Sequence, residues 1–238
     1  MKFKTKIKTA IKLFLKKEYP FKVQVKIKSK WLGNEYGGFY VSPEFLNEKS
    51  VVYSFGIGED ISFDKELLSL YKCTVHGFDP TPKSITWVKN NSLPKNFFFH
   101  EYGIDSKNGT VTFYLPKNPD HVSGTVQKVN DSRSESITVP MKNLTTIAKE
   151  SGHTYIDVLK MDIEGSEYSV IPDILSSGIS IKQILIEFHH RFFDDGFKKN
   201  KETVDLLNSK GYKIFAVSDT NMEVSFIHSS LLNSSLHD

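Results

Sequence analysis

Two short motifs hold the residues best suited to chemistry, and each lies at the end of an apolar run. Lys160, Asp162 and Glu164 alternate through the end of YIDVLKM and beyond it, and Glu187 and His189 alternate at the end of KQILIEF. Alternate residues of a strand lie on one face, so each set shares one side. Asp162, Glu187 and His189 are therefore candidates for an O/O/N set that binds a hard or borderline divalent metal, or for a base with its orienting acid.

Two neighbours of these residues have less certain roles. His190 follows His189 and is a second candidate in the same motif. Glu167 is expected to support the first turn of the following helix or the loop, rather than to take part in chemistry. The structural alternative is a buried Glu187 paired with a lysine or arginine, with both histidines in an ordinary loop.

A glycine-containing turn and an acid about 20 residues later predict a nucleoside site. In SFGIGED, Gly56 and Gly58 follow the apolar run VVYSF and allow the backbone to approach a ligand closely. Asp79 ends the next apolar run, where a carboxylate can accept hydrogen bonds from both hydroxyls of a ribose. The alternatives are an ordinary glycine turn and a helix cap before Pro82, a role that Thr81 could also fill.

The elements that position these residues form a β/α pattern. From residue 50, short apolar runs alternate with helical patterns, which predicts a parallel sheet with helices on both faces. Residues 211–217 and 223–228 are separated by a turn short enough to require an antiparallel hairpin. Such an ending after about five parallel strands is typical of class I methyltransferases, whereas a nicotinamide-dependent dehydrogenase keeps its sheet parallel. The expected strands are 51–55, 73–78, 97–102, 110–115, 137–140, 155–161, 182–188, 211–217 and 223–228, and the expected helices are 61–71, 82–90, 143–151, 166–177 and 197–209.

Four further segments complete this pattern. Residues 21–28 alternate like a strand, and residues 31–41 are expected to form a glycine-rich, aromatic loop. Asn108-Gly109 predicts a hairpin between 97–102 and 110–115. The polar residues 117–135 are a candidate mobile loop over the site. We expect an N-terminal extension at 1–49 and a methyltransferase domain at 50–238.

The net charge of +3 is unevenly distributed. Residues 1–30 contain eleven lysines and one acid, Glu18, so this segment carries +10 and the rest of the chain −7. Apolar residues recur at helical spacing from Phe3 to Leu15, which predicts a basic amphipathic helix. This helix could be a solvated helix that packs on the domain by its apolar side, or residues 1–20 could associate peripherally with an anionic membrane. Nucleic acid is not expected as a partner, because no RNA-binding signature is present.

Composition narrows the class of protein. The chain has 238 residues, of which 39% are hydrophobic, enough for one large domain with a core. A single cysteine, Cys73, excludes an internal disulfide framework and a cysteine-rich zinc site. No apolar run approaches the roughly 20 residues of a membrane helix. We therefore expect a soluble, cytoplasmic protein, with the inner membrane face as a peripheral location.

The run from Val51 to Arg191 resembles the FkbM family of S-adenosylmethionine-dependent methyltransferases. The resemblance lies in VVYSFGIGEDISFD, in Asp79, and in YGIDSKNG, KMDIEGSEY and ILIEFHHRF, of which KMDIEGSEY is the most specific. The glycine motif departs from the family pattern at two positions. Ser54 stands where the family has an aspartate, and Asp60 replaces a later glycine. The resemblance implies a Rossmann-like α/β fold, with S-adenosylmethionine as the cofactor and methyl transfer to an oxygen, commonly a sugar or polyol hydroxyl.

The resemblance also implies a cofactor site. Glycines 56 and 58 and the backbone around Ile57 would hold the methionine end, Asp79 the ribose, and Gly103 and Ile104 the adenine. The residues predicted to bind the cofactor are Phe55, Gly56, Ile57, Gly58, Asp60, Asp79, Pro80, Gly103, Ile104 and Asp162.

On the acceptor side we expect His189 to act as the base, as a neutral imidazole, or as a metal ligand. Asp162, Glu164 and Glu187 would orient the acceptor or a magnesium or manganese ion. The acceptor is expected to be a glycan or another small molecule. Trp31, Tyr36 and Phe39 are candidates for a surface that stacks on a sugar.

Other functions remain open at this point. The departures at Ser54 and Asp60 are compatible with a binding module that has lost turnover. A dehydrogenase would need a fuller glycine fingerprint. A methyltransferase that acts on a protein, a nucleic acid or another non-carbohydrate acceptor is a further alternative, and the oligomeric state is left open.

Overall fold

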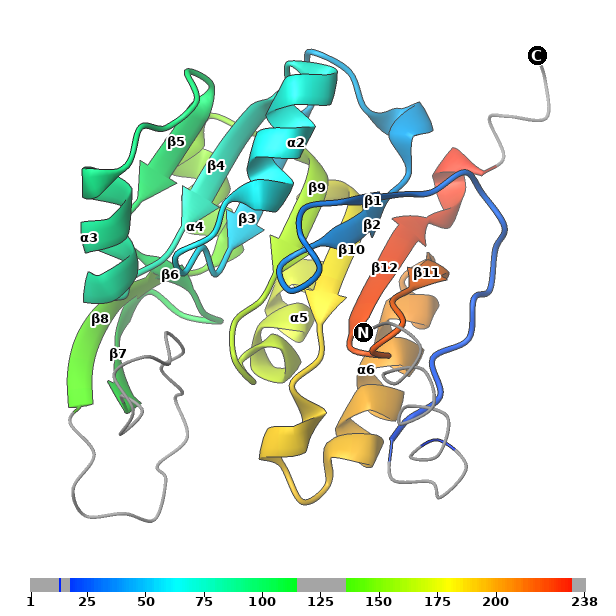
Figure 1. Cartoon of the computed structure of the whole chain (residues 1–238). Helices are drawn as coiled ribbons and strands as arrows, with labels where there is room; N and C mark the ends of the chain where they lie inside the picture. The colour runs from blue at the N-terminus through cyan, green and yellow to red at the C-terminus, as the bar shows by residue number, and fades with distance from the viewer. Residues whose placement is uncertain (1–12, 14–17, 115–135, 233–238) are drawn as a thin grey trace.

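A seven-stranded sheet forms the middle layer of the protein in a computed structural model, which describes Leu13, residues 18–114 and residues 136–232 (Figure 1). The strand order is β11-β12-β10-β9-β3-β4-β5. The strands are β3 (Val51–Phe55), β4 (Thr74–Phe78), β5 (Phe97–His100), β9 (Tyr155–Met161), β10 (Ser180–Glu187), β11 (Tyr212–Val217) and β12 (Glu223–His228). Strands β10, β9, β3, β4 and β5 are parallel to one another. Strand β12 is antiparallel to both β10 and β11, so the predicted closing hairpin is confirmed.

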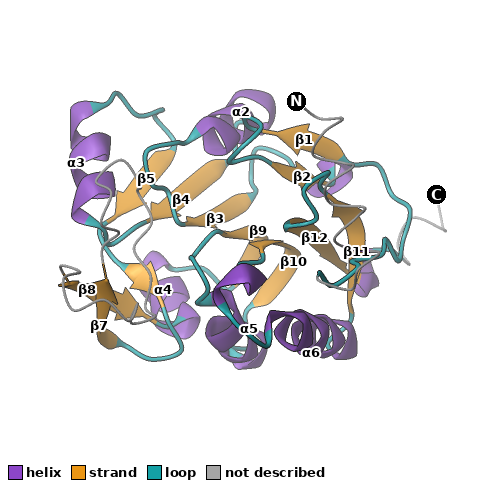
Figure 2. Ribbon diagram, turned by 60° about the horizontal axis from the view of Figure 1, so that its bottom comes forward, coloured by secondary structure: helices purple, strands orange, loops and turns teal. Residues whose placement is uncertain are grey.

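Helices cover both faces of this sheet (Figure 2). One face of the sheet forms an apolar core with α2 (Ser62–Tyr71) and α3 (Pro82–Asn90). The other face forms a second apolar core with α4 (Leu144–Ser151), α5 (Glu167–Ser176) and α6 (Gly196–Ser209). All five residues of β3 are buried, as expected for a central parallel strand that is covered on both sides. The doubly wound α/β fold predicted from the sequence is therefore confirmed.

A separate three-stranded sheet corrects one prediction. It consists of β6 (Gly103–Ile104), β8 (Ser136–Lys142) and β7 (Gly109–Tyr114), in that order. Strand β7 pairs with β8, so Asn108-Gly109 does not form the expected hairpin with 97–102. The Asn108 side chain instead accepts a hydrogen bond from the Asn143 N–H (2.9 Å) and donates one to Thr146 (2.9 Å). It thus anchors the start of α4, and the chain leaves the main sheet after β5.

The segment 21–28 is extended but is not the predicted strand. The N–H groups of Gln24 and Val25 both donate to the Ile214 carbonyl oxygen, at 2.8 and 3.2 Å. The Ile214 N–H donates to the side-chain oxygen of Gln24 rather than to a backbone carbonyl. A side chain occupies the place of a ladder acceptor, and no regular strand pairing with β11 develops.

The segment 31–41, expected to be a loop, has a strand at each end. Strands β1 (Lys30–Leu32) and β2 (Phe39–Val41) pair antiparallel, with Trp31 opposite Tyr40. Below β2, the Ser42 N–H donates to the Gln183 amide oxygen (2.7 Å), which ties this hairpin to β10. The loop 33–38 is thereby fixed over the carboxyl end of the sheet (Figures 1 and 2).

Some predictions fall outside the described residues. These are the basic helix at 1–19, of which only Leu13 and residues 18–19 are described, and the loop at 117–135. No helix within 18–114 or 136–232 is long and apolar enough to cross a membrane. The boundary between 1–49 and 50–238 stays a prediction, although buried residues of β1 and β2 share a core with β3.

Candidate active site

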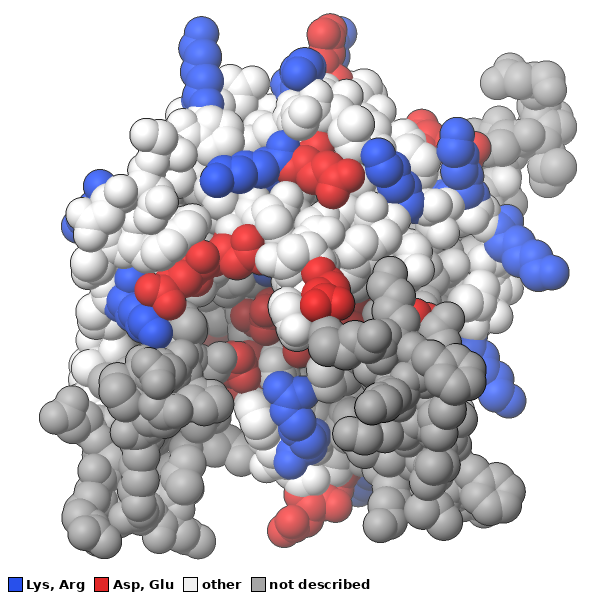
Figure 3. Space-filling model, in the orientation of Figure 1, with Lys and Arg blue, Asp and Glu red and all other residues white. Residues whose placement is uncertain are grey.

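A cavity of about 320 Å³ lies where the parallel strands end. Strand β3 leads to α2 on one face and β9 leads to α5 on the other, so the chain directions diverge there and leave a crevice. The ten residues predicted to bind a cofactor all line it: Phe55, Gly56, Ile57, Gly58, Asp60, Asp79, Pro80, Gly103, Ile104 and Asp162. Acidic side chains gather in this hollow and along its upper rim (Figure 3). Contact of these residues with a cofactor stays a prediction.

Gly56 joins the ends of three strands. Its φ is +80°, and a Cβ at this position would lie 1.7 Å from the Asp162 carbonyl oxygen, so only glycine fits. The Gly56 N–H donates to the Phe78 carbonyl (3.0 Å), and the Asp162 N–H donates to the Phe55 carbonyl (3.1 Å). The turn after β3 is thus held against both β4 and β9.

Lys160 supports this turn from below. The sequence placed it at the catalytic edge with Asp162, but Lys160 is buried and its Nζ donates to the Gly56 carbonyl oxygen at 3.1 Å. Asp64 of α2 is buried nearby; burial raises its pKa, while the charge of Lys160 and the hydroxyl of Ser54 oppose that rise. A carboxylate from α2 therefore faces Ser54, the position at which the glycine motif lacks an aspartate.

Asp79 has structural partners as well as a place in the cavity. One carboxylate oxygen accepts the Gly58 N–H (2.9 Å), and the other accepts the Thr81 N–H (2.9 Å) and hydroxyl (2.6 Å). Thr81 in turn caps α3 by accepting the Ser84 N–H, as the capping alternative predicts. A carboxylate has about four acceptor positions, so Asp79 retains capacity for a ligand hydroxyl.

Asp60 is bound mainly to the protein. Its Oδ2 accepts hydrogen bonds from the Asn34 amide (2.6 Å) and the Ser62 hydroxyl (2.9 Å), and its Oδ1 accepts the Ser62 N–H (2.9 Å). It therefore connects the start of α2 to the β1–β2 loop. Where a glycine would leave this loop unattached, Asp60 fixes it at the rim of the cavity.

The opposite end of the cavity is apolar. Pro80, Gly103, Ile104, Phe113 and Met141 line it, and Ile104 and Met141 are buried. A wall of this kind suits the faces of a planar base. The strand pairing of β6 with β8 places Gly103 opposite Met141.

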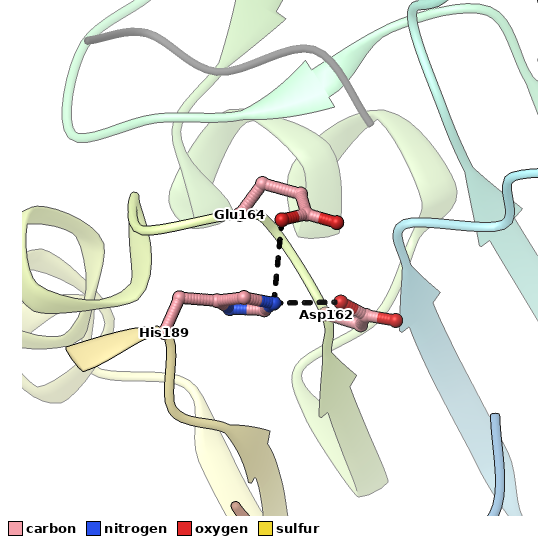
Figure 4. Close-up of side chains that lie close together, drawn as sticks. All are labelled: Asp162, Glu164 and His189. Atoms are coloured by element: carbon pink, nitrogen blue, oxygen red, sulfur yellow. Dashed lines mark ion pairs between the residues drawn. The ribbon is translucent and has the colours of Figure 1, made fainter. Parts of the chain in front are cut away.

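The predicted catalytic residues converge at the end of the cavity next to β9 and β10. The His189 Nε2 lies 3.6 Å from Asp162 Oδ1, 3.4 Å from Glu164 Oε2 and 3.5 Å from Glu187 Oε1. The side chains of Asp162, Glu164 and His189 point toward one another (Figure 4). Asp162 and Glu164 also line the cavity, whereas Glu187 and His189 stand behind them. We call these four residues the acidic cluster.

The charges within the acidic cluster shift the pKa values of its members. Burial alone would lower the pKa of His189, but the hydrogen bond and charge of Glu167, with the charges of Glu187 and Glu164, raise it to about 9. Burial and the charge of Asp162 raise the pKa of Glu187 well above its usual range. The acids around His189 therefore favour its charged form, and its role as a neutral base or a metal ligand stays a prediction.

Glu167, which the sequence assigned to the support of its helix or the loop, contacts both the loop and His189. It is buried, its Oε1 accepts the His189 N–H at 2.7 Å, and its Oε2 accepts the Gly165 N–H at 2.9 Å. It lies 3.5 Å from the His189 Nδ1. One side chain thus sets the position of His189 and of the loop that contains Glu164.

Glu164 itself has a left-handed backbone, with φ of +51°. This conformation costs a residue with a Cβ about 1 kcal/mol, and such strain often accompanies functional sites. The tight turn aims the Glu164 carboxylate back at His189 rather than outward along the strand direction.

Two of the predicted site residues, His190 and Phe39, lie away from the cavity and the acidic cluster. The His190 Nε2 is 3.9 Å from Glu18 Oε1 on the N-terminal segment, so His190 does not join the acidic cluster. Phe39 is buried in the core and cannot stack on a ligand, which contradicts its predicted role. Tyr36 is 72% exposed at the rim of the cavity.

The family model that describes the FkbM methyltransferase domain matches residues 51–214. The chain belongs to the FkbM methyltransferase family. It is 26% identical over 153 residues to human probable methyltransferase-like protein 24, covering 63% of this chain and 36% of that protein. The rat protein of the same name is 25% identical over 153 residues, with the same coverage of each chain. This chain thus spans about a third of the length of these curated relatives.

Solved structures with a distant likeness include other methyltransferases. The fibrillarin pre-rRNA processing protein of Methanococcus jannaschii has a TM-score of 0.46 and 11% identity, over 89% of this chain and 87% of that chain. Human N-acetylserotonin methyltransferase in complex with S-adenosylmethionine has a TM-score of 0.39 and 13% identity, over 75% and 47%. The FkbM resemblance predicted from the sequence is confirmed by the family match.

Proposed function

We propose that this chain transfers the methyl group of S-adenosylmethionine to a hydroxyl oxygen. The main support for the proposal is that the cofactor cavity and the acidic cluster share two residues. Asp162 and Glu164, which contact His189, also line the cavity that contains the glycine turn and Asp79. A cofactor held by that turn would present its reactive end to the acidic cluster.

The cavity offers a partner for each part of the cofactor. The close backbone of Gly56 and Gly58 suits the methionine end, and Asp79 suits the ribose hydroxyls. The apolar wall of Ile104 and Met141 suits the adenine.

The chemistry requires alignment and removal of one proton. The acceptor oxygen forms a bond to the methyl carbon while the carbon–sulfur bond breaks, and the electron pair goes to sulfur, which becomes a neutral thioether. The hydroxyl proton passes to the carboxylate of Asp162 or Glu164, which line the cavity. The imidazolium of His189 holds both carboxylates in position.

The same residues suit a divalent cation. Asp162, Glu164 and His189 can each offer one ligand atom, and these atoms lie within 4.8 Å of one another. Two carboxylates and an imidazole fit manganese or magnesium, and an ion would replace the proton on His189. Such an ion would polarise the acceptor hydroxyl. Calorimetry of Mn²⁺ with wild-type protein and Glu164→Gln tests the site, since binding should be lost in the variant.

A sugar hydroxyl is the acceptor we favour. The FkbM resemblance implies a sugar or polyol, and the negative charge of the acidic cluster would repel a phosphate-rich acceptor such as a nucleic acid. Labelled S-adenosylmethionine incubated with panels of glycans, proteins and RNA tests this. Transfer to a glycan hydroxyl, lost in Glu164→Gln, supports the proposal; transfer to another class alone would replace the acceptor.

The second candidate is a binding module without turnover. The departures at Ser54 and Asp60 favour it, because they alter the glycine motif. It predicts binding of S-adenosylhomocysteine with no methyl transfer to any panel, whereas a methyltransferase binds the same ligand and turns over.

A further inference from the structure

A second cavity, of about 410 Å³, lies beside the first. It is formed by the β1–β2 hairpin and the turn between β11 and β12. We call it the aromatic groove, and its described lining is Trp31, Gly33, Asn34, Glu35, Tyr36, Tyr40, Ser218, Asp219, Thr220 and Glu223. Asn34 and Tyr36 line both cavities, so the groove and the cofactor cavity share a wall.

The groove is connected to the acidic cluster through Glu223. Glu223 is the register partner of Glu187 across the β10–β12 pair, and its charge helps to raise the pKa of Glu187. Hydroxyls of Ser218 and Thr220 donate to the Glu223 carboxylate and fix it at the floor. A molecule in the groove would therefore extend toward the cluster from the side opposite the adenine wall.

Two aromatic side chains of the groove, Trp31 and Tyr40, are held in place. The Trp31 indole N–H donates to the Asn34 carbonyl (3.1 Å), and the Trp31 and Tyr40 rings meet edge to face at 5.1 Å. Asn34 is itself bound to Asp60 at the rim of the cofactor cavity. Rigid aromatic faces of this kind attract the slightly positive C–H face of a sugar ring, since the ring faces are negative.

The charge of the groove selects against anions. Glu35, Asp219 and Glu223 line it, and its described lining includes no lysine or arginine. Carboxylates and hydroxyls accept and donate hydrogen bonds to sugar hydroxyls, but they repel phosphate, sulfate and uronate groups. A nucleic acid or an acidic polysaccharide is thus a poor fit.

We propose that the aromatic groove binds a neutral sugar unit of the acceptor, with Trp31 and Tyr36 as the stacking surfaces and Glu35 as part of the selection against anionic glycans. The proposal rests on the proposed function in taking this sugar to belong to the methyl acceptor. Binding of the sugar, by contrast, requires no turnover.

Binding to an array of neutral, amino, sulfated and uronate-containing glycans tests the proposal. Wild-type protein is expected to bind neutral glycans, and Tyr36→Ala to weaken that binding roughly tenfold, as loss of an aromatic anchor does. Tyr36 is exposed, so this variant should fold. Trp31→Ala provides the second test, and Trp87→Ala, which alters α3 outside the groove, is its control.

Charge reversal tests the selection. Glu35→Lys should admit sulfated or uronate glycans, whereas Glu48→Lys, an exposed position outside both cavities, should not. No neutral glycan bound, binding unchanged in both aromatic variants, or a preference of wild-type protein for anionic glycans would overturn the proposal.

Failure of this proposal is distinguishable from failure of the proposed function. Groove-dependent glycan binding with no methyl transfer would remove the activity and retain the groove. Transfer to a glycan hydroxyl with an unchanged KM in Tyr36→Ala and Trp31→Ala would retain the activity and remove the groove.

Discussion

The Glu167 carboxylate accepts the backbone N–H of His189 at 2.7 Å, across 22 residues of sequence. Its other oxygen accepts the Gly165 N–H in the loop of Glu164. The first residue of α5 therefore couples the ends of β9 and β10, the two strands that supply the acidic cluster. Glu167 is a positioning residue in this account.

Removal of Glu167 should misplace His189 and the Glu164 loop, while Gly56 and Asp79 keep their positions in the cofactor cavity. In Glu167→Ala the buried His189 N–H loses its acceptor, which costs about 1–3 kcal/mol of stability. Methyl transfer should fall about 10–100-fold, as when other residues that only position a functional side chain are removed, while S-adenosylhomocysteine binding is retained. Glu167→Gln keeps an acceptor and should restore much of the transfer rate; failure of this rescue, with both variants folded, would argue against positioning.

Glu164 should support methyl transfer at a small cost in the stability of the fold. Asparagine tolerates a left-handed backbone better than glutamate, so Glu164→Asn should leave the Tm unchanged or raise it slightly, while transfer falls at least about 100-fold. Thermal unfolding and transfer rates measure the two effects. Glu150→Asn, an exposed helix residue with ordinary backbone, is the control. A clear loss of Tm in Glu164→Asn would contradict the strain argument.

The histidines outside the site should make the stability of the fold sensitive to acid. Burial, and then the charges of His100 and His153, lower the pKa of His76 to about 4, and the His76 Nδ1 lies 3.0 Å from the His100 Nε2. The unfolded chain binds the proton near pH 6.5, so this stability is complete above that pH and is lost as the pH falls toward 4. After allowance for solvent screening, we expect a loss of about 1–2 kcal/mol.

Urea unfolding between pH 7.5 and pH 4.5, in wild-type protein and His76→Asn, measures this loss. Asparagine can reproduce the Nδ1 hydrogen bond but does not titrate. The difference in free energy of unfolding between the two proteins should narrow as the pH falls. A constant difference would show that His76 does not supply the acid sensitivity.

The basic segment 1–20 stays a proposal for membrane association. A chain that lacks these residues should lose binding to vesicles of anionic lipid, while full-length protein should bind them less at high salt. Vesicle co-sedimentation measures both, with neutral vesicles as the control. Equal binding by the two chains would exclude this segment as the attachment.

The convergence of Asp162 and His189 was predictable, because carboxyl ends of neighbouring parallel strands meet at one edge of a sheet. The closing hairpin was predictable from the short turn before Met222. The partners of Asp60 and Asp79 were not, since they depend on turns whose geometry emerges only when β3, β4 and the β1–β2 loop are packed together.

The other differences between the predictions and the structure involve residues whose sequence context is compatible with more than one role. Asn108-Gly109 is a hairpin signal, but Asn108 binds the start of α4. Lys160 alternates with Asp162, yet the strand ends between them and its amine turns under Gly56. The charge on His189 depends on Glu167, and no periodicity relates these two residues.

The proposed function depends on the binding of S-adenosylmethionine in the Gly56–Asp79 cavity. Titration calorimetry with S-adenosylhomocysteine tests it most directly, using wild-type protein, Asp79→Asn and, as a control, Glu101→Gln, an exposed acid that does not line the cavity. We predict one-to-one binding that weakens at least about tenfold in Asp79→Asn and is unchanged in Glu101→Gln. No binding by folded wild-type protein, or equal binding by Asp79→Asn, would contradict the claim.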